Sequence, residues 1–138
     1  MPWHAGDLIR LAARVAGWLA VIAIVIVSLV PGDLRPHLAA SNKLEHFSAY
    51  FVAAMLLRIG HTRRQTSLGI AVLLPILAGS LEIAQLWIPG RHARLTDFAV
   101  SSFGVWVALA ALLLLRRFYP AVAVEHRKTD TGTTHTPN

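Results

Sequence analysis

Two carboxylates, Glu82 and Asp97, flank a short basic turn within sequence that is otherwise apolar enough for lipid. An acidic side chain at the centre of a membrane helix costs about 2.5 to 3.5 kcal/mol on insertion scales, so a chain that keeps two must pair them or use them. His46 could act with them as an acid or base, and Arg91 could bind a phosphate or a carboxylate. The chemistry therefore depends on which helices bring these four residues together.

The composition is that of a small membrane protein. Of the 138 residues, 55% are hydrophobic and only 14% are charged, which is too apolar for one short domain in water. The formal charge of +6 does not indicate nucleic-acid binding, because the basic residues lie at the ends of apolar runs. The absence of cysteine excludes disulfides, a thiolate nucleophile and a cysteine-ligated metal. The lipid bilayer is the expected partner, and no cofactor is expected.

Apolar runs separated by turn-forming residues predict an all-α membrane protein with four transmembrane helices in an antiparallel bundle. The first run is longer than the apolar core of a signal peptide and ends in Pro31-Gly32 without a small-x-small cleavage site, so we interpret it as an uncleaved span. The domain is expected to cover residues 1–119 and to precede a disordered cytoplasmic tail, residues 120–138. The spans are expected at about residues 11–30, 43–60, 67–88 and 95–115.

Two of these spans depart from a simple apolar helix. The second has a short apolar run and approaches the ~20 residues that a bilayer needs only by including Glu45 and His46. Ser41 and Asn42 directly before it are candidates for its N-cap. The third contains Pro75, which frees a backbone carbonyl inside the helix. A neighbouring helix must satisfy that carbonyl, since lipid cannot.

The distribution of Lys and Arg predicts the topology. Four alternating spans place Arg35, Lys43, Arg91 and Arg94 on one side of the membrane. The other side takes the remaining basic residues, which are Arg10, Arg14, Arg58, Arg63, Arg64, Arg116, Arg117, Arg127 and Lys128. Because cytoplasmic segments carry the excess of basic residues, both termini are expected in the cytoplasm and the turn after Glu82 outside it.

Helical spacing predicts a shared interior face near the outer surface. By helix rise, Glu82 lies about 10 Å below Pro89, while His46 and Asp97 each lie about 5 Å below the start of their helices. Three helices would therefore bring ionisable groups to one depth. The stripes that carry them, spaced three or four residues apart, are Lys43, His46 and Tyr50; Glu82, Gln85 and Pro89; and Asp97, Ser101, Gly104 and Ala108.

Three motifs in this order resemble the VanZ-like family of small bacterial membrane proteins: NKLEHFSAY at 42–50, E-x-x-Q-x-x-x-P-G-R at 82–91 and D-x-x-x-S-x-x-G at 97–104. The sequence departs from the family pattern at Asn42, where Asp is usual, and at Ser101, where Asn is usual. The resemblance implies a multi-pass protein of the bacterial inner (cytoplasmic) membrane. It selects Lys43, His46, Phe47, Tyr50, Glu82, Gln85, Pro89, Gly90, Arg91, Asp97 and Gly104.

The family takes its name from a protein linked to reduced sensitivity to teicoplanin, a lipoglycopeptide antibiotic. The resemblance therefore implies a protein that binds an anionic lipid headgroup, a cell-wall lipid precursor or a lipoglycopeptide-type amphiphile, with Arg91 on the phosphate or carboxylate and Lys43 beside it. The expected ligand-binding residues are Lys43, His46, Tyr50, Glu82, Gln85, Arg91 and Asp97. Those expected to serve the structure are Phe47, Pro89, Gly90, Ser101 and Gly104.

Two other functions remain open on the same residues. In an enzyme acting on a lipid-linked substrate, the catalytic candidates are His46, Glu82 and Asp97, although the sequence contains no nucleophile motif. A proton-coupled transporter would use Glu82 as its carrier and would need a homodimer to enclose a pathway. One histidine and two acids are few ligands for a metal, so the sequence predicts no metal site.

A purely structural interpretation accounts for part of the same set. His46, Gln85 and Ser101 can act as hydrogen-bonding contacts between helices, worth about 0.6 kcal/mol each. Asp97 can be an acid that suits the start of a helix and pairs with Arg94 or Arg91. Glu82 is the deepest acid and its own helix offers it no capping role, which favours a functional interpretation for it.

Overall fold

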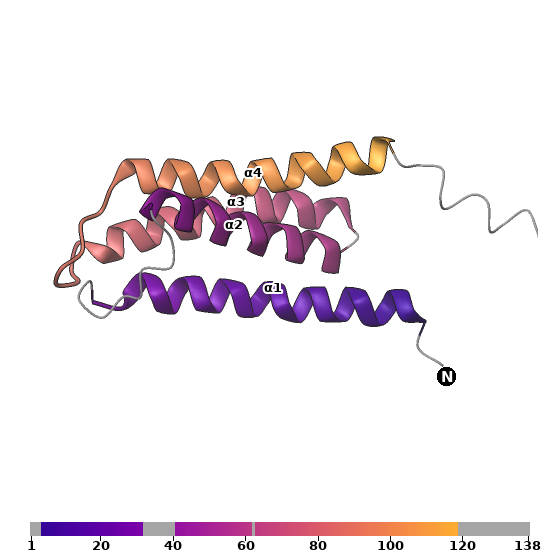
Figure 1. The fold of residues 1–138 in the computed structure, drawn as a ribbon, viewed down its shortest axis with the longest axis horizontal. Helices are drawn as coiled ribbons and strands as arrows, with labels where there is room; N and C mark the ends of the chain where they lie inside the picture. The colour runs from indigo at the N-terminus through magenta and orange to yellow at the C-terminus, as the bar shows by residue number, and fades with distance from the viewer. Residues whose placement is uncertain (1–3, 32–40, 62, 119–138) are drawn as a thin grey trace, which may run out of the picture.

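The computed structural model describes residues 4–31, 41–61 and 63–118, and all of the regular structure in these ranges is helical. The predicted disordered tail, residues 120–138, lies outside the described residues. The helices pack side by side as a bundle, with α2 and α3 between α1 and α4 in the view of Figure 1. Their bounds are α1 (Ala5–Leu29), α2 (Asn42–Gly60), α3 (Arg64–Gln85) and α4 (Leu95–Phe118). The all-α prediction is confirmed for the described residues.

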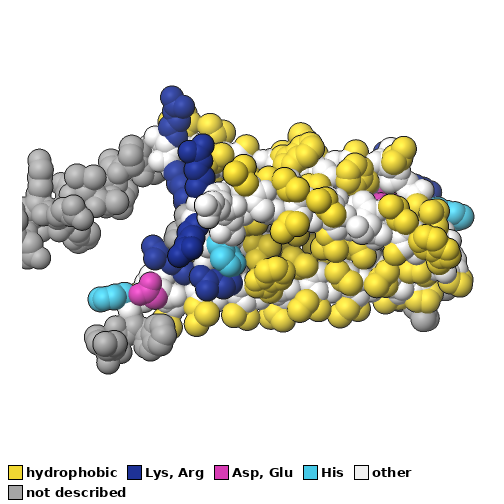
Figure 2. Space-filling view, turned by 180° about the vertical axis from the view of Figure 1, so that it is seen from behind, with side chains coloured by type: hydrophobic (Ala, Val, Ile, Leu, Met, Phe, Trp, Pro, Cys, Tyr) yellow, Lys and Arg dark blue, Asp and Glu magenta, His cyan; other side chains and the backbone are white. Residues whose placement is uncertain are grey.

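The surface of the bundle is suited to lipid. Three helices, α1, α3 and α4, are long and apolar enough to cross a membrane. Hydrophobic side chains cover the bundle between its two ends (Figure 2), and large ones such as Leu73 and Phe103 are more than half exposed. Apolar surface on this scale is unfavourable in water but matches a hydrocarbon core. These are the features of a multi-pass membrane protein.

The second helix, α2, is less apolar because it lies among the others. It packs against both α1 and α4, and it buries Tyr50, Ala53, Ala54 and Leu57. In a membrane, a helix that other helices enclose presents little surface to lipid, so small and polar residues can replace large apolar ones there. The weak apolar run of this segment is therefore explained by its position in the bundle.

Glycines allow α2 to approach its neighbours closely. A Cβ atom on Gly104 of α4 would lie 2.6 Å from the carbonyl oxygen of Phe47 in α2. A Cβ atom on Gly60 of α2 would likewise lie 2.6 Å from the backbone nitrogen of Arg14 in α1. Because both obstacles are backbone, a side chain at either position would push two helices apart. Gly104 belongs to the predicted stripe on α4, which is buried at Ser101 and Ala108 as well.

The proline inside α3 is compensated by α4. Pro75 has no N–H, so the carbonyl of Ala71, four residues earlier, loses its usual helical partner. The indole Nε1 of Trp106 in α4 donates to that carbonyl at 3.2 Å. The prediction that a neighbouring helix satisfies the freed carbonyl is thus confirmed, and the donor is identified.

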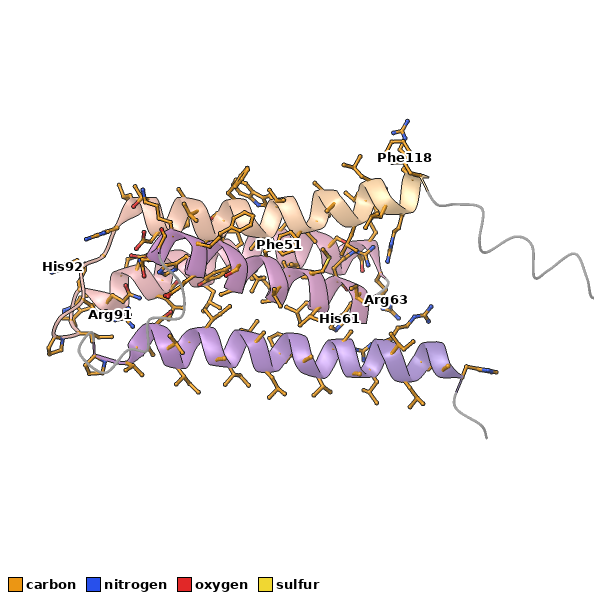
Figure 3. The ribbon with its side chains drawn as sticks, viewed as in Figure 1. Phe51, His61, Arg63, Arg91, His92 and Phe118 are labelled. Carbon is orange, nitrogen blue, oxygen red and sulfur yellow. The ribbon has the colours of Figure 1, made fainter. Side chains whose placement is uncertain are left out.

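The two ends of the bundle differ in charge. Lys and Arg side chains gather at the end where α1 begins and α4 ends (Figure 2). Figure 3 places Arg63 at this basic end and Arg91 at the opposite end, beside the turn between α3 and α4. A band of basic residues at one edge of an apolar bundle is typical of a cytoplasmic membrane face.

Arginines at the basic end satisfy carbonyls where α2 terminates. Arg14 Nη2 donates to the carbonyl of Gly60 at 3.1 Å, and Arg58 Nη1 donates to that of His61 at 2.6 Å. The last carbonyls of a helix have no partner within it, and basic side chains also suit the negative end of the helix dipole. These contacts involve only protein groups at the end of α2 and need no ligand.

The helix bounds differ slightly from the predicted spans. α1 starts at Ala5 and α4 extends to Phe118, because a helix continues beyond the part that lipid covers. α3 stops at Gln85, short of the predicted residue 88, because the chain turns there. Ser41 occupies the N-cap position of α2 as expected, but its side chain makes no capping hydrogen bond.

Candidate functional site

A tight turn at Pro89-Gly90 shapes the end of the bundle opposite the basic end. The N–H of Arg91 donates to the carbonyl of Ile88 at 3.2 Å, and Gly90 has a φ of 73°. A proline at the second position and a glycine with positive φ at the third are the features of a type II turn. The P-G-R motif therefore bends the chain after α3, and the turn sets the position of Arg91.

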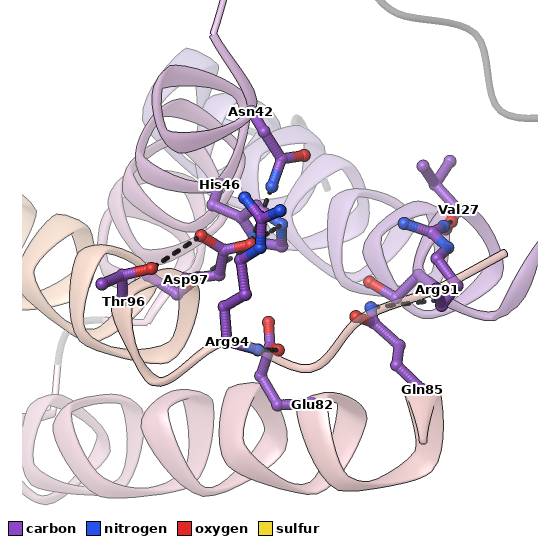
Figure 4. Close-up of polar contacts among 11 residues, drawn as sticks. Val27, Asn42, His46, Glu82, Gln85, Arg91, Arg94, Thr96 and Asp97 are labelled. Carbon is purple, nitrogen blue, oxygen red and sulfur yellow. Dashed lines mark hydrogen bonds and ion pairs between the residues drawn. The ribbon is translucent and has the colours of Figure 1, made fainter. Parts of the chain in front are cut away.

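Arg91 and Gln85 fasten this turn to α1 (Figure 4). Arg91 Nε donates to the carbonyl of Val30 at 3.0 Å, and its Nη2 donates to the carbonyl of Val27. Gln85 Nε2 donates to the carbonyl of Ser28 at 3.2 Å. These carbonyls belong to the end of α1, where the helix itself supplies no donors. Both motif residues therefore have a structural task, in addition to the ligand contacts predicted for them.

Glu82 holds the start of α4. Its side chain is buried, and its Oε2 accepts the backbone N–H of Arg94 at 2.9 Å. The carbonyl of Arg94 in turn accepts the N–H groups of Asp97 and Phe98, so Arg94 is the N-cap residue directly before α4. Glu82 has a capping role after all, toward the helix that follows its own. Sequence reasoning missed this role because the partner lies across the turn.

Asp97 joins the starts of α2 and α4. Its Oδ2 accepts a hydrogen bond of 2.7 Å from Asn42 Nδ2, and its Oδ1 lies 3.4 Å from the Thr96 hydroxyl. An acid in the first turn of α4 also suits the positive end of that helix. The predicted pairing of Asp97 with Arg94 or Arg91 is wrong for the described residues, because Asn42 takes that place.

His46 lies between Asp97 and Ser101 of α4, and Figure 4 shows it beside Asp97. Its Nδ1 is 3.3 Å from Ser101 Oγ, and its Nε2 is 3.8 Å from Asp97 Oδ2. The His46 and Asp97 side chains are only 11% and 6% exposed, so water screens the pair weakly. The contact with Ser101 fixes the ring and directs Nε2 toward the carboxylate.

The three ionisable residues predicted to share one depth are brought together. One ligand-type atom from each of His46, Glu82 and Asp97 lies within 4.8 Å of the other two, and the residues come from α2, α3 and α4. We call this group the three-helix cluster. Tyr50 is buried further along α2, whereas Lys43 is exposed in the first turn of that helix.

The remaining predicted residues lie around the three-helix cluster. Phe47 stacks on Phe51, with ring centroids 5.8 Å apart, and also contacts Phe103 of α4 at 6.1 Å. Pro89 is exposed in the turn, and Ser101 is 1% exposed. The aromatic contacts and the close approach at Gly104 press α2 onto α4 and so fix the distance between His46 and Asp97.

The connection from Ser101 through His46 to Asp97 has the residue types of a catalytic triad but not its access. A nucleophilic serine must reach the carbonyl of its substrate, and Ser101 is 1% exposed. The three-helix cluster can instead transfer a proton through His46, accept hydrogen bonds from a ligand, or coordinate a cation. Each of these uses the carboxylates and imidazole that α2, α3 and α4 supply.

Sequence reasoning missed the roles of Asn42 and Arg94. Asn42 drew attention only as a possible cap and as a departure from a family pattern. Its spacing of four residues from His46 put it on the same helix face, which is the signal that could have linked it to the histidine's neighbours. The role of the Arg94 backbone depends on the path of the turn, for which the sequence carries no comparable signal.

Comparison with known proteins returned no match: no protein-family profile and no curated protein matches the sequence, and no solved structure matches the fold. The relationship to VanZ-like proteins therefore rests on the motifs alone and remains a proposal.

Proposed function

We propose that the protein is a VanZ-like, four-span protein of the bacterial cytoplasmic membrane that binds the anionic headgroup of an amphiphile at its outer end. The difference between the two ends of the bundle carries this proposal. Basic residues gather where α1 begins and α4 ends, and the opposite end holds the three-helix cluster. By the rule that basic residues mark the cytoplasmic side, both termini are cytoplasmic and the cluster is near the outer surface.

Lys43 and Arg94 are the basic residues best placed to meet a ligand at this end. Both are exposed, one in the first turn of α2 and the other directly before α4. Arg91 is less suited, because its guanidinium already donates to carbonyls of α1. A phosphate or carboxylate between the two exposed side chains would receive charged hydrogen bonds, while the apolar surface of the bundle accommodates its acyl chain.

Teicoplanin is a practical probe, because it is an amphiphile that can be added to the protein in nanodiscs of neutral lipid. We expect the double variant Lys43→Gln/Arg94→Gln to bind it about 10-fold to 30-fold more weakly, since each basic residue near a membrane surface contributes about 1 kcal/mol toward an anionic partner. The matched control is Arg63→Gln/Arg64→Gln, which removes two exposed basic residues from the basic end. Equal losses in the two double variants would contradict a specific site at the outer end.

The topology has a separate test. A reporter that is active only in the periplasm should be inactive when fused after Arg117 and active when inserted at His92, in the turn between α3 and α4. Activity after Arg117 would place the C-terminal end of α4 outside the cytoplasm. The placement of both termini in the cytoplasm would then be wrong.

A second candidate function is catalysis on a lipid-linked substrate, favoured by the contacts of His46 with Ser101 and Asp97. In this case His46 would exchange a proton with the substrate, while Asp97 would stabilise its protonated form. Mass spectrometry of membrane lipids should then show a modified species in cells that overproduce the protein and not in cells that overproduce His46→Gln. An unchanged lipid profile would favour the binding protein.

A further inference from the structure

We infer that His46, Glu82 and Asp97 form a binding site for one divalent transition-metal ion. An imidazole and two carboxylates are ligands that such ions take, and here they come from three different helices. Their ligand-type atoms lie within 4.8 Å of one another, so one ion could contact all three after small side-chain movements. The site goes beyond the proposed binding of an amphiphile and does not depend on it.

The charge of the site favours a cation. Glu82 is 8% exposed and Asp97 is 4% exposed, and both lie in a bundle with an apolar exterior. Within the described part of the chain, the one ion pair that either carboxylate makes is the 3.8 Å contact of Asp97 with His46. Two buried carboxylates repel each other strongly where water is scarce. A divalent ion would neutralise both at once.

The geometry around His46 resembles that of a metal ligand held by a second contact. Ser101 Oγ, 3.3 Å from Nδ1, orients the ring, as outer contacts commonly do for ligating histidines. The 3.8 Å between Nε2 and Asp97 Oδ2 exceeds a hydrogen bond. It is close to the separation of about 3.4 Å between two ligands of a tetrahedral ion with bonds of about 2.1 Å.

The mixture of nitrogen and oxygen ligands favours Zn²⁺ or Mn²⁺ over Mg²⁺. Three protein ligands also leave a coordination position open for water or for an oxygen of another molecule. Asn42 is adjacent, since its amide nitrogen lies 2.7 Å from Asp97 Oδ2. Replacing this amide with a carboxylate would therefore place a fourth ligand oxygen near the ion.

The first experiment measures metal content directly. The full-length protein, purified in detergent with a tag that lacks histidine, is stripped with EDTA, incubated with Zn²⁺ or Mn²⁺, dialysed and analysed by mass spectrometry for metal. We expect one ion per chain in the native protein and less than a tenth of that in His46→Gln and in Asp97→Asn. His92→Gln, which changes an exposed histidine in the turn, is the matched control and should keep the ion. No retained ion in the native protein, or equal retention in all variants, would overturn the inference.

Asn42→Asp provides a second test that removes no proposed ligand, so the inference can still be tested if a ligand variant fails to fold. Without metal it should melt at a lower temperature than the native protein, because a third carboxylate then faces Asp97 at contact distance. With metal it should gain affinity by on the order of tenfold, because affinity follows the number of charged ligands. Its melting temperature should then rise more on metal addition than that of the native protein. An equal or smaller rise would overturn the inference. With a non-ionic detergent, neither experiment contains an anionic amphiphile, so failure here leaves the proposed function intact.

Discussion

The two ends of the bundle use their polar side chains in different ways. At the basic end, Arg14 and Arg58 donate to backbone carbonyls where α2 stops, and no acid takes part in these contacts. At the opposite end, Asp97 and His46 contact side chains of other helices. The first arrangement completes the terminus of α2, whereas the second, together with the hydrogen bond of the Arg94 N–H to Glu82, connects α2, α3 and α4. Substitutions at the second should therefore change more than one helix contact.

The end opposite the basic end contains two sets of contacts. Arg91 and Gln85 join the turn to α1 through backbone carbonyls, as the arginines of the basic end do for α2. The three-helix cluster involves α2, α3 and α4 but not α1. Structural and functional candidates from the same motif can therefore be separated by which helix they contact.

The largest effect is expected where α2 and α4 approach most closely. Gly104→Ala should lower the free energy of unfolding by about 2 to 3 kcal/mol, because its Cβ would meet the carbonyl oxygen of Phe47 at 2.6 Å and separate the helices that carry the cluster. Gly69→Ala in α3 is the control, since nothing lies within 4 Å of a Cβ there. Unfolding of the purified protein in mixed micelles measures both. Equal stability of the two variants would show that α2 and α4 can move apart without lowering the free energy of unfolding.

The next largest effect is the difference in cost between removing a buried acid and removing an exposed one. In buffer with EDTA, Asp97→Ala should lower the free energy of unfolding by about 2 kcal/mol, because the partly buried Asn42 amide loses its charged acceptor. Asp7→Ala removes an acid whose 3.7 Å pair with Arg10 is half exposed, and should cost less than about 0.5 kcal/mol. A gain in stability for Asp97→Ala would mean that its repulsion with Glu82 outweighs the hydrogen bond.

The fold was predictable where helical spacing and apolar length determine it. The all-helical bundle and the burial of the α4 stripe at Ser101 and Gly104 both follow from periodicity. The interior position of α2 was not predictable, because a weak apolar run can mean either a poor span or a shielded one. Only packing against α1 and α4 distinguishes the two.

The residues that make up the site could be predicted from the sequence. Most of their hydrogen-bond partners could not. Depth along the helices correctly brought His46, Glu82 and Asp97 together. The contacts of Glu82 with the Arg94 backbone and of Arg91 with α1 depend on the turn between α3 and α4. No sequence pattern shows which backbone carbonyls at the end of another helix will lie beside the turn. A basic residue in the turn is therefore most readily interpreted as a ligand contact.

A smaller effect should separate Arg91 from Arg94. Arg91→Gln should lower the free energy of unfolding by about 1 to 2 kcal/mol, because two carbonyls at the end of α1 lose their donor. Arg94→Gln should leave stability within about 0.5 kcal/mol, since its side chain is exposed and its backbone N–H to Glu82 is retained. Unfolding and teicoplanin binding are measured on both variants. If Arg91→Gln weakened binding without loss of stability, Arg91 would be a ligand contact rather than a hydrogen-bond donor that stabilises the end of α1.

The smallest effect tests the contact in the apolar middle, between the two ends. Trp106→Phe should cost about 0.6 kcal/mol, the usual size of a hydrogen bond between membrane helices, because the Ala71 carbonyl freed by Pro75 loses its donor. In a Pro75→Ala background the helix supplies its own N–H to that carbonyl, so the same substitution should cost only what the loss of the larger ring costs. A double-mutant cycle of unfolding free energies measures the difference. Equal costs in the two backgrounds would show that Trp106 contributes packing alone, and that the bundle tolerates the proline without help from α4.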